Sequence, residues 1–214
     1  MVQVKYFTFN AFAENTYLLY DETKECVLID PGCYEKAEKA ELEEFIRSNE
    51  LKVVRLFNTH CHIDHVLGNK FVTDTFEVGL EVPEYEVAGF NSVPVYAPVY
   101  GFTQYAPAEI ARTIQKDEVI RFGNSELKVL FVPGHSEGHV AFYCESQGFC
   151  INGDVLFQGS IGRTDLPGGD FTTLIQSIKN VMFELPEETV VYCGHGPSTT
   201  IGFEKQHNPF LNAE

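Results

Sequence analysis

The sequence has no long run of apolar residues, and this absence argues against a membrane-spanning protein. A helix that crosses a bilayer needs about 20 consecutive apolar residues, and no segment of the 214 residues approaches that length. The N-terminal segment MVQVKYFTFN also lacks the charged stretch, apolar stretch and cleavage site of a secretory signal. We therefore expect a cytoplasmic protein without a membrane partner.

Positive charge is scarce as well. Fifteen Lys and Arg residues stand against 31 Asp and Glu residues, which gives a formal net charge of -16. Such a field repels a phosphate backbone, so we do not expect nucleic acid as a partner. A small anionic substrate is not excluded, because a metal ion and one nearby Arg reverse the potential inside a pocket.

Cys-x-x-Cys pairs are absent among the six cysteines. A chain of 214 residues, 44% of them hydrophobic, buries enough surface to fold as a single domain, residues 1–214, without disulfide bonds. We expect reduced thiols. Cys61 and Cys193 are close in sequence to histidines, and we interpret them as small buried side chains, with oxidation-sensitive thiols as the alternative.

The pattern of apolar residues predicts a mixed α/β fold. Alternation predicts antiparallel strands over residues 2–10, 16–20 and 26–30, and helical spacing predicts a helix from Glu35 to Glu50. Further strands are expected at 51–58, 127–135, 139–144, 148–154 and 189–195, and a helix at 170–183 with Asp170 as its N-cap. Residues 81–109, rich in proline and aromatic residues, show no sustained period and predict a long ordered loop or lid.

The segment NTHCHIDHVLGN, residues 58–69, concentrates residues that bind metals. Only seven histidines occur in the chain, and three of them lie within six positions together with an aspartate: His60, His62, Asp64 and His65. In an extended segment, residues two apart face the same way, so His60, His62 and Asp64 would point to one side. Imidazole and carboxylate are usual ligands of zinc and iron.

Four residues in one segment still leave gaps around an ion that distant residues must fill. Candidates follow later strand-like runs and lie next to or near glycine: His135 and His139 in VPGHSEGH, Asp154 in INGDVLF, and His195 in YCGHGPST. His135 and His139 have the spacing of a helical metal-binding pair. The flanking glycines and Pro133 argue against a helix, so both need not be ligands.

The ordered motifs resemble a known family. HCHIDH matches the His-x-His-x-Asp-His signature of the metallo-β-lactamase superfamily, and LIDPG, PGHSEGH, GD and GHG occur in the order seen there, over a span from Asn15 to His195. The resemblance implies an α/β fold, a four-layer αββα sandwich of two mixed β-sheets, with a two-metal site at one edge of the sheets.

The resemblance also implies a role for each candidate residue. One divalent metal ion would be held by His60, His62 and His135, the other by Asp64, His65 and His195, and Asp154 would bridge the pair. Zinc is the expected metal, with iron or manganese as alternatives. Asp30 of LIDPG would lie behind a ligand and orient it, and His139 would either lie behind the ligands or begin a strand.

Two further segments narrow the resemblance to one branch. Residues 159–170 (GSIGRTDLPGGD) and 194–211 are similar to the short, glyoxalase II-like (hydroxyacylglutathione hydrolase-like) enzymes, which hydrolyse thioesters. In that chemistry a water that bridges two cations has its pKa lowered from about 15.7 to near 7, and the resulting hydroxide attacks the thioester carbonyl. Asp64 and Asp154 would anchor the metals and accept or steer the proton. An aspartate at position 154 disfavours a β-lactam substrate.

Substrate recognition is less defined by the sequence. Arg163 of GRTD would bind a substrate carboxylate in bidentate fashion, and Lys205 is a second candidate for this role. The alternative for Arg163 is a structural ion pair with Asp165. Aromatic residues of segment 81–109, Tyr96, Tyr100 and Phe102, would cover an acyl group or pack as a satellite core. Which thiol carries the acyl group, glutathione included, stays open.

Two other functions compete with thioester hydrolysis. GRTD and the metal-binding histidines also resemble persulfide dioxygenases, in which a single iron would be held by His60, His135 and Asp154, a facial triad with open positions. A non-enzymatic interaction protein braced by its metal site is the other alternative. It is disfavoured because structural zinc sites are closed by four protein ligands, whereas seven ligands for two metals leave room for water.

Overall fold

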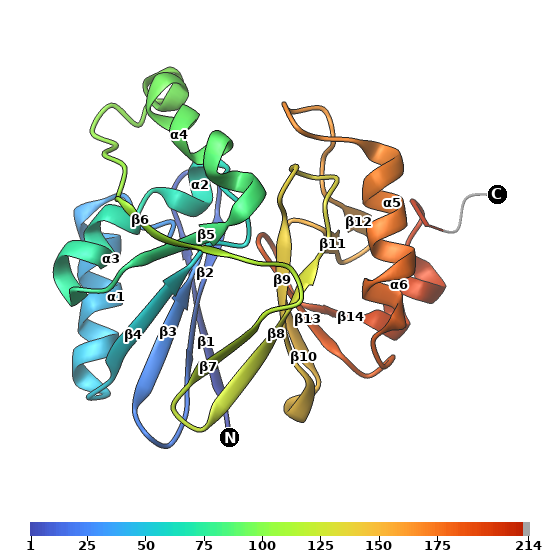
Figure 1. Ribbon diagram of the computed structural model, residues 1–214, viewed down its shortest axis with the longest axis horizontal. Coiled ribbons are helices and arrows are strands. Elements are labelled where there is room, and N and C mark those ends of the chain that lie inside the picture. Colours follow the sequence, from blue (N-terminus) through green and yellow to red (C-terminus); the bar gives the residue numbers. More distant parts are fainter. Residues whose placement is uncertain (212–214) are drawn as a thin grey trace. The chain divides into compact units, whose positions relative to one another are not determined.

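Two six-stranded β-sheets, each flanked by helices, form the framework of the computed structural model, which describes residues 1–211 (Figure 1). The chain divides into two compact units, residues 1–114 with 121–126 and residues 115–120 with 127–214. Within the described residues no helix has the length and apolar character that a membrane crossing requires.

The first sheet has the strand order β1-β2-β3-β4-β5-β6. β1 (Gln3–Phe9), β2 (Glu14–Tyr20) and β3 (Glu25–Ile29) pair antiparallel, as predicted. From β3 onward, β4 (Lys52–Phe57), β5 (Leu80–Pro83) and β6 (Ile110–Ile114) add in parallel. The sheet is therefore mixed, and the loop after β4 leaves from the carboxyl end of a parallel strand.

Helices α1 (Lys36–Ser48), α2 (Ile63–Val66) and α3 (Asn69–Phe76) follow β3 and β4. The predicted helix at 35–50 is confirmed as α1. Its Leu42 and Ile46 pack with Val72 of α3 in one core cluster that also contains Leu28 and Leu56 of the sheet. This cluster of aliphatic side chains fixes the position from which the loop after β4 begins.

The prediction of a long loop at residues 81–109 is wrong for most of this segment. After β5 the chain forms a 3₁₀ turn, η1 (Glu84–Glu86), then helix α4 (Val87–Tyr96) and a second 3₁₀ turn, η2 (Ala97–Tyr100). Phe90, Val93 and Phe102 join the core of the first unit. The apolar residues of α4 are not confined to one face, and Pro94 lies inside it, so the helical period was not visible in the sequence.

The second sheet has the strand order β14-β13-β10-β9-β8-β7. Its strands are β7 (Val119–Phe122), β8 (Ser125–Phe131), β9 (Val140–Cys144), β10 (Phe149–Gly153), β13 (Val190–Cys193) and β14 (Thr199–Thr200). β10 and β13 pair in parallel, whereas β8, β9 and β10 pair antiparallel, so this sheet is mixed too. A small ribbon of β11 (Leu156–Phe157) and β12 (Ser160–Ile161) follows β10.

Two helices and two 3₁₀ turns complete the second unit: α5 (Phe171–Asn180), α6 (Ile201–His207), η3 (Glu145–Gln147) and η4 (Met182–Glu184). Asp170 caps α5 as predicted, since its Oδ1 accepts the backbone N–H of Thr173 at 2.7 Å. Leu174 and Ile178 of α5 share a core cluster with Cys150 and Val191 of the sheet. This core therefore fixes the ends of β8, β10 and β13. The segments with His135, Asp154 and His195 follow these strands.

Candidate metal centre

The loop after β4 carries four of the predicted ligands. His60 and His62 precede α2, with His62 as its N-cap, and Asp64 and His65 lie within the helix. The expectation that one extended segment presents His60, His62 and Asp64 to one side is wrong for Asp64. The backbone of His62 is still extended, but the chain then turns into a helix that buries Ile63 and Val66.

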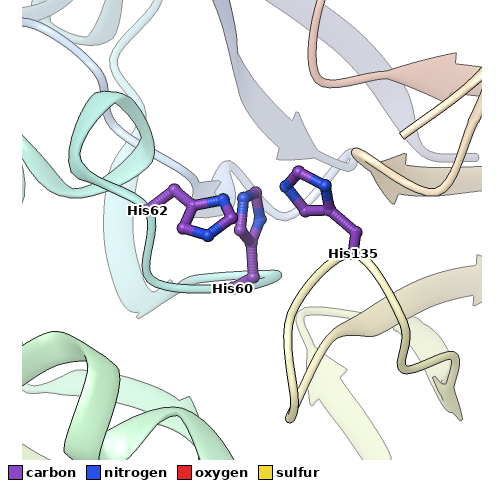
Figure 2. A group of neighbouring side chains, drawn as sticks. All are labelled: His60, His62 and His135. Atoms are coloured by element: carbon purple, nitrogen blue, oxygen red, sulfur yellow. The ribbon is translucent and has the colours of Figure 1, made fainter. Parts of the chain in front are cut away.

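The imidazole rings of this loop lie close together. The ring centroids of His60 and His62 are 4.7 Å apart and the rings are nearly perpendicular. Figure 2 shows the two side chains next to each other. The ring centroids of His60 and His65 are 4.2 Å apart. His60 and His65 also present donor atoms that lie, with one from Asp30, within 4.8 Å of each other. The first unit therefore contributes a compact set of imidazole and carboxylate donors.

Asp30 anchors this part of the loop through hydrogen bonds. Its Oδ1 accepts the backbone N–H of Thr59 at 2.7 Å, and its Oδ2 accepts the Thr59 hydroxyl at 2.6 Å. The same Oδ2 lies 3.2 Å from Nδ1 of His65, and the Thr59 hydroxyl oxygen lies 3.0 Å from Nδ1 of His60. Asp30 thus occupies the position that the predicted orienting role requires.

These contacts define the tautomer of both rings. The Thr59 hydroxyl has one proton and donates it to Asp30, so it accepts the proton on Nδ1 of His60. The carboxylate of Asp30 likewise favours a proton on Nδ1 of His65. In each ring the lone pair is then on Nε2. A histidine that binds a metal usually does so as neutral imidazole, with its other ring N–H donated to a neighbouring group.

Other polar groups support helix α2. Asn10 Nδ2 donates to the carbonyl of Asp64 at 3.0 Å, and Asn58 Nδ2 donates to the carbonyl of His65 at 2.9 Å. Glu14 is fully buried, with Oε1 3.9 Å from Nδ1 of His65. Burial raises the pKa of Glu14 well above its usual range, and the nearby His65 opposes this shift. The ligand loop is therefore braced by side chains from β2 and the β1–β2 turn.

The second unit brings its three predicted ligands together around one carboxylate. His135 lies on the loop after β8 (Figure 2), Asp154 follows β10, and His195 follows β13. Oδ2 of Asp154 is 3.6 Å from Nε2 of His135 and 3.4 Å from Nε2 of His195. An aspartate between two imidazoles is the arrangement expected of a bridging ligand.

His135 and Asp154 are oriented by groups of the same unit. Nδ1 of His135 donates to the backbone carbonyl of Arg163 at 2.8 Å, which directs its Nε2 toward Asp154. His139 is buried, and its Nε2 accepts the backbone N–H of Asp154 at 3.1 Å. This is the supporting position predicted for His139, immediately before β9. The loop requires glycine at position 162, because a Cβ there would lie 1.9 Å from the carbonyl oxygen of Asp154.

The predicted substrate-binding residues are both paired with acidic side chains. Arg163 donates to both carboxylate oxygens of Asp165, at 2.7 and 2.8 Å, so the ion pair considered as its alternative role is present. Both side chains are more than half exposed, and such a pair contributes little to stability. Nζ of Lys205 lies 3.9 Å from Oε1 of Glu187 and above the ring of Phe183.

The aromatic residues of segment 81–109 take different positions. Phe102 is buried and Tyr96 packs against the core of the first unit, whereas Tyr100 is half exposed. Tyr100 and Phe102 line a cavity of about 290 Å³ together with Asn10, Ala11, Tyr34, Glu35, Glu38 and Gly101. Part of the segment is thus core, and part of it forms the wall of a cavity.

All six cysteines are free and buried, in agreement with the interpretation as small buried side chains. Burial raises the pKa of the Cys193 thiol to about 12, and the nearby Asp154 adds to the shift. Burial also raises the pKa of Cys61 far above its usual range. Both thiols are therefore held protonated at neutral pH, which keeps them poor nucleophiles and poor metal ligands.

Comparison with known proteins bears on this arrangement. The family model described as "Metallo-beta-lactamase superfamily" matches residues 10–195. A hydroxyacylglutathione hydrolase, GloC of Haemophilus influenzae, is 36% identical over 208 residues, which cover 95% of both chains. The similarity therefore extends over nearly the whole chain, and the range matched by the family model contains the positions of all seven predicted ligands.

Solved structures show the same fold. The BLEG-1 B3 metallo-beta-lactamase superposes with a TM-score of 0.90 at 34% identity, covering 99% of this chain and 100% of the other. TTHA1623, solved in a di-iron-bound form, superposes with a TM-score of 0.86 at 34% identity, covering 97% of this chain and 100% of the other. The predicted fold class, with two mixed sheets flanked by helices, is confirmed.

Proposed function

The chain belongs to the metallo-β-lactamase superfamily of metal-dependent hydrolases, and from this premise we propose that it hydrolyses thioesters with two bound divalent metal ions. The two donor sets would combine as the sequence predicts. His60, His62 and His135 would hold one ion, Asp64, His65 and His195 the other, and Asp154 would bridge them. The substrate would be a small-molecule thioester.

The donor chemistry fits such a site. Neutral imidazoles presenting Nε2 and two carboxylates are suitable ligands for zinc, iron or manganese. The observation that carries the proposal is the carboxylate of Asp154, with Oδ2 3.6 and 3.4 Å from the Nε2 atoms of His135 and His195. Three groups from three different strand ends converge there, and in a protein without metal their mutual packing would have little purpose.

The residues of the chain would divide the work of hydrolysis. When bound, the two ions would supply Lewis acidity and lower the pKa of a water to about 7. Asp154 and Asp64 would accept or steer the proton of the attacking water as it adds to the thioester carbonyl. Asp30, Thr59 and the Arg163 carbonyl would keep the imidazoles in one tautomer. The thiolate then leaves without a protein acid, because it is a stable anion.

The assignment of a thioester substrate rests on the similarity to GloC. GloC is a hydroxyacylglutathione hydrolase of similar length, since the alignment covers 95% of each chain. We therefore place S-D-lactoylglutathione first among the substrates to be tested, followed by thioesters of other thiols. Arg163 is the proposed partner of a substrate carboxylate, which it would bind in exchange for Asp165.

The test is metal analysis of the purified protein followed by assays with a panel of thioesters. We expect two metal ions per chain and turnover of at least one thioester. We expect the variant Asp154→Asn to lose both the bound metal and the turnover. Asp165→Asn is the matched control, because Asp165 is an exposed aspartate of the same unit; it should retain both ions.

Three further assays decide among the alternatives. A β-lactam belongs in the panel because BLEG-1 is similar over its whole length. Oxygen uptake on a persulfide, with a single iron per chain, would replace our proposal by the dioxygenase. Two bound metals with no activity on thioesters, lactones, β-lactams or persulfides would instead favour the non-enzymatic alternative.

A further inference from the structure

Glu86 is a buried carboxylate that the proposed reaction does not use. It is the last residue of η1, at the junction with α4, and only 4% of its surface is exposed. Its neighbour two residues earlier, Glu84, is exposed on the same turn. Burying a carboxylate is costly unless it is hydrogen-bonded, so the contact that Glu86 makes inside the protein requires an explanation.

The contact leads to the ligand loop. Oε2 of Glu86 accepts the backbone N–H of Cys61 at 2.9 Å. Cys61 stands between His60 and His62, the two residues proposed to hold the same ion. The orientation of a peptide plane determines the directions in which the flanking side chains leave the backbone. Glu86 therefore acts on a group whose rotation would move the imidazoles of His60 and His62 relative to each other.

A second carboxylate holds the loop on the other side of His60. Asp30 Oδ1 accepts the N–H of Thr59 at 2.7 Å. Asp30 precedes Thr59 by 29 residues, and Glu86 follows Cys61 by 25 residues. The two N–H groups that flank His60 are thus bound by buried carboxylates from opposite directions along the chain.

The rest of the α4 segment keeps this contact away from water. Tyr96 and Tyr105 both pack against the core of the first unit. Cys61 is a member of the same core cluster, and only 2% of its surface is exposed. Because Cys61 and Glu86 are both buried, solvent does not compete for the N–H of Cys61.

We propose that Glu86 is a positioning residue, which fixes the Cys61 peptide and thereby the mutual geometry of His60 and His62 as ligands of one metal ion. The inference rests on the metal site of the proposed function but not on the substrate. It assigns the buried part of segment 81–109 a function: the segment supplies the acceptor that completes the ligand loop.

The test compares two substitutions that separate position from charge. Glu86→Gln keeps an oxygen acceptor at the same distance from the backbone, whereas Glu86→Asp keeps the charge but withdraws the acceptor by one methylene. We expect Glu86→Gln to bind zinc with an affinity close to that of wild type. For Glu86→Asp we expect an affinity about 10- to 100-fold weaker, the usual effect of losing a group that orients a ligand.

The measurement is a competition between metal-free protein and a chromophoric chelator, with the absorption spectrum of the cobalt-substituted protein as a second readout. We expect the cobalt bands of Glu86→Asp to shift, because the ligand geometry changes, and those of Glu86→Gln to match wild type. Glu84→Asp is the matched control on the same turn, and it should behave as wild type in both measurements.

Three outcomes would overturn the inference. The reverse order, with Glu86→Gln weak and Glu86→Asp tight, would mean that Glu86 acts through its charge. Equal metal affinity and identical cobalt spectra in all variants, with only a lower melting temperature of the metal-free protein, would reduce Glu86 to a structural brace. Failure of the wild type to bind metal would refute the proposed function itself, and with it the site that Glu86 is proposed to position.

Discussion

The two sets of metal-binding residues are built in different ways. In the first unit, four candidate ligands lie within six positions of one loop, and the loop is held by buried side chains, chiefly Asp30. In the second unit, His135, Asp154 and His195 come from the ends of three strands and are spread over 61 positions of the sequence. There the support comes from backbone groups and from His139.

The difference shows what fixes the geometry of each set of metal-binding residues. In the loop of the first unit, the N–H groups of Thr59 and Cys61 bind carboxylates, so we expect its geometry to depend on those side chains. The second set inherits its geometry from the sheet, because the strands β10 and β13 pair in parallel and so deliver Asp154 and His195 at the same edge. Substitutions of supporting side chains should therefore be felt more strongly in the first unit.

The largest effect is expected for Asp154→Ala. This change removes the carboxylate between His135 and His195, so we expect metal content and turnover to fall together, turnover by more than about 100-fold. Metal analysis and thioester assays of the purified variant measure both. The companion variant His139→Ala removes the acceptor of the Asp154 N–H and a ring contact with His135, but no proposed ligand, and should retain most of the metal. Equal metal loss in the two variants would refute this division of roles.

A smaller effect is expected for Asp30→Asn, and it tests the comparison directly. The amide has one oxygen in place of two, so it cannot accept from both the backbone N–H and the hydroxyl of Thr59 while also orienting His65. We expect metal affinity to fall about 10- to 100-fold, measured by chelator competition. An Asp30→Asn variant with wild-type affinity would show that the loop holds its geometry without the carboxylate.

Asp21→Asn is the control for that experiment, with an effect on stability alone. Asp21 is buried and accepts from Thr23, from the backbone N–H of Asn124 at 2.7 Å and from the Ser125 hydroxyl at 2.7 Å. Burial raises the pKa of Asp21, but the hydrogen bonds from Thr23 and Ser125 outweigh it and lower the pKa to about 2. The variant should lose about 2 kcal/mol of unfolding free energy at pH 7 and keep its metal affinity.

The same pKa gives the pH dependence of this effect. Because the folded-state pKa of Asp21 lies below the ordinary value of 3.8, its contribution is complete above about pH 5 and is lost as the pH falls toward 2. Denaturation curves at pH 7 and pH 3 should therefore show a smaller difference between wild type and Asp21→Asn at the lower pH. A difference that grows with acidity would contradict the low pKa.

The smallest effect is expected for Arg163→Ala. The backbone carbonyl that orients His135 remains, so metal content should not change. The ion pair of the side chain with Asp165 is exposed, so we expect the stability to change little. If Arg163 binds substrate, KM for a thioester with a carboxylate should rise while KM for an uncharged thioester stays constant. Unchanged KM values for both would leave Arg163 with the ion pair alone.

The sequence predicted most of this framework for identifiable reasons. The strands that carry the ligands and helices α1 and α5 show clear periods or capping residues, such as Asp170, and all were found where expected. The first ligand loop was visible because its histidines are adjacent. The later ligands were found through ordered motifs rather than through spacing, since no local pattern relates His135 to Asp154 or His195.

What the sequence did not reveal depends on contacts between distant segments. Helix α2 has four residues, too few to show a period, so Asp64 was expected in an extended segment. Helix α4 lacks a polar face, so its segment was taken for a loop. Glu86 and Thr59 carry no local signal, because their importance arises from partners brought near by the fold: Cys61 for one and Asp30 for the other.

His60 and His65 share one supporting carboxylate, Asp30, and this has a consequence for metal binding. These two residues are proposed to serve different ions, yet one reaches Asp30 through the Thr59 hydroxyl and the other directly. When one of these rings binds an ion, the ion withdraws electron density from the ring and from Asp30. The same carboxylate of Asp30 polarises the other ring. If both ions bind as proposed, we expect their uptake to be coupled, and a titration with metal should depart from a curve for two independent sites of different affinity.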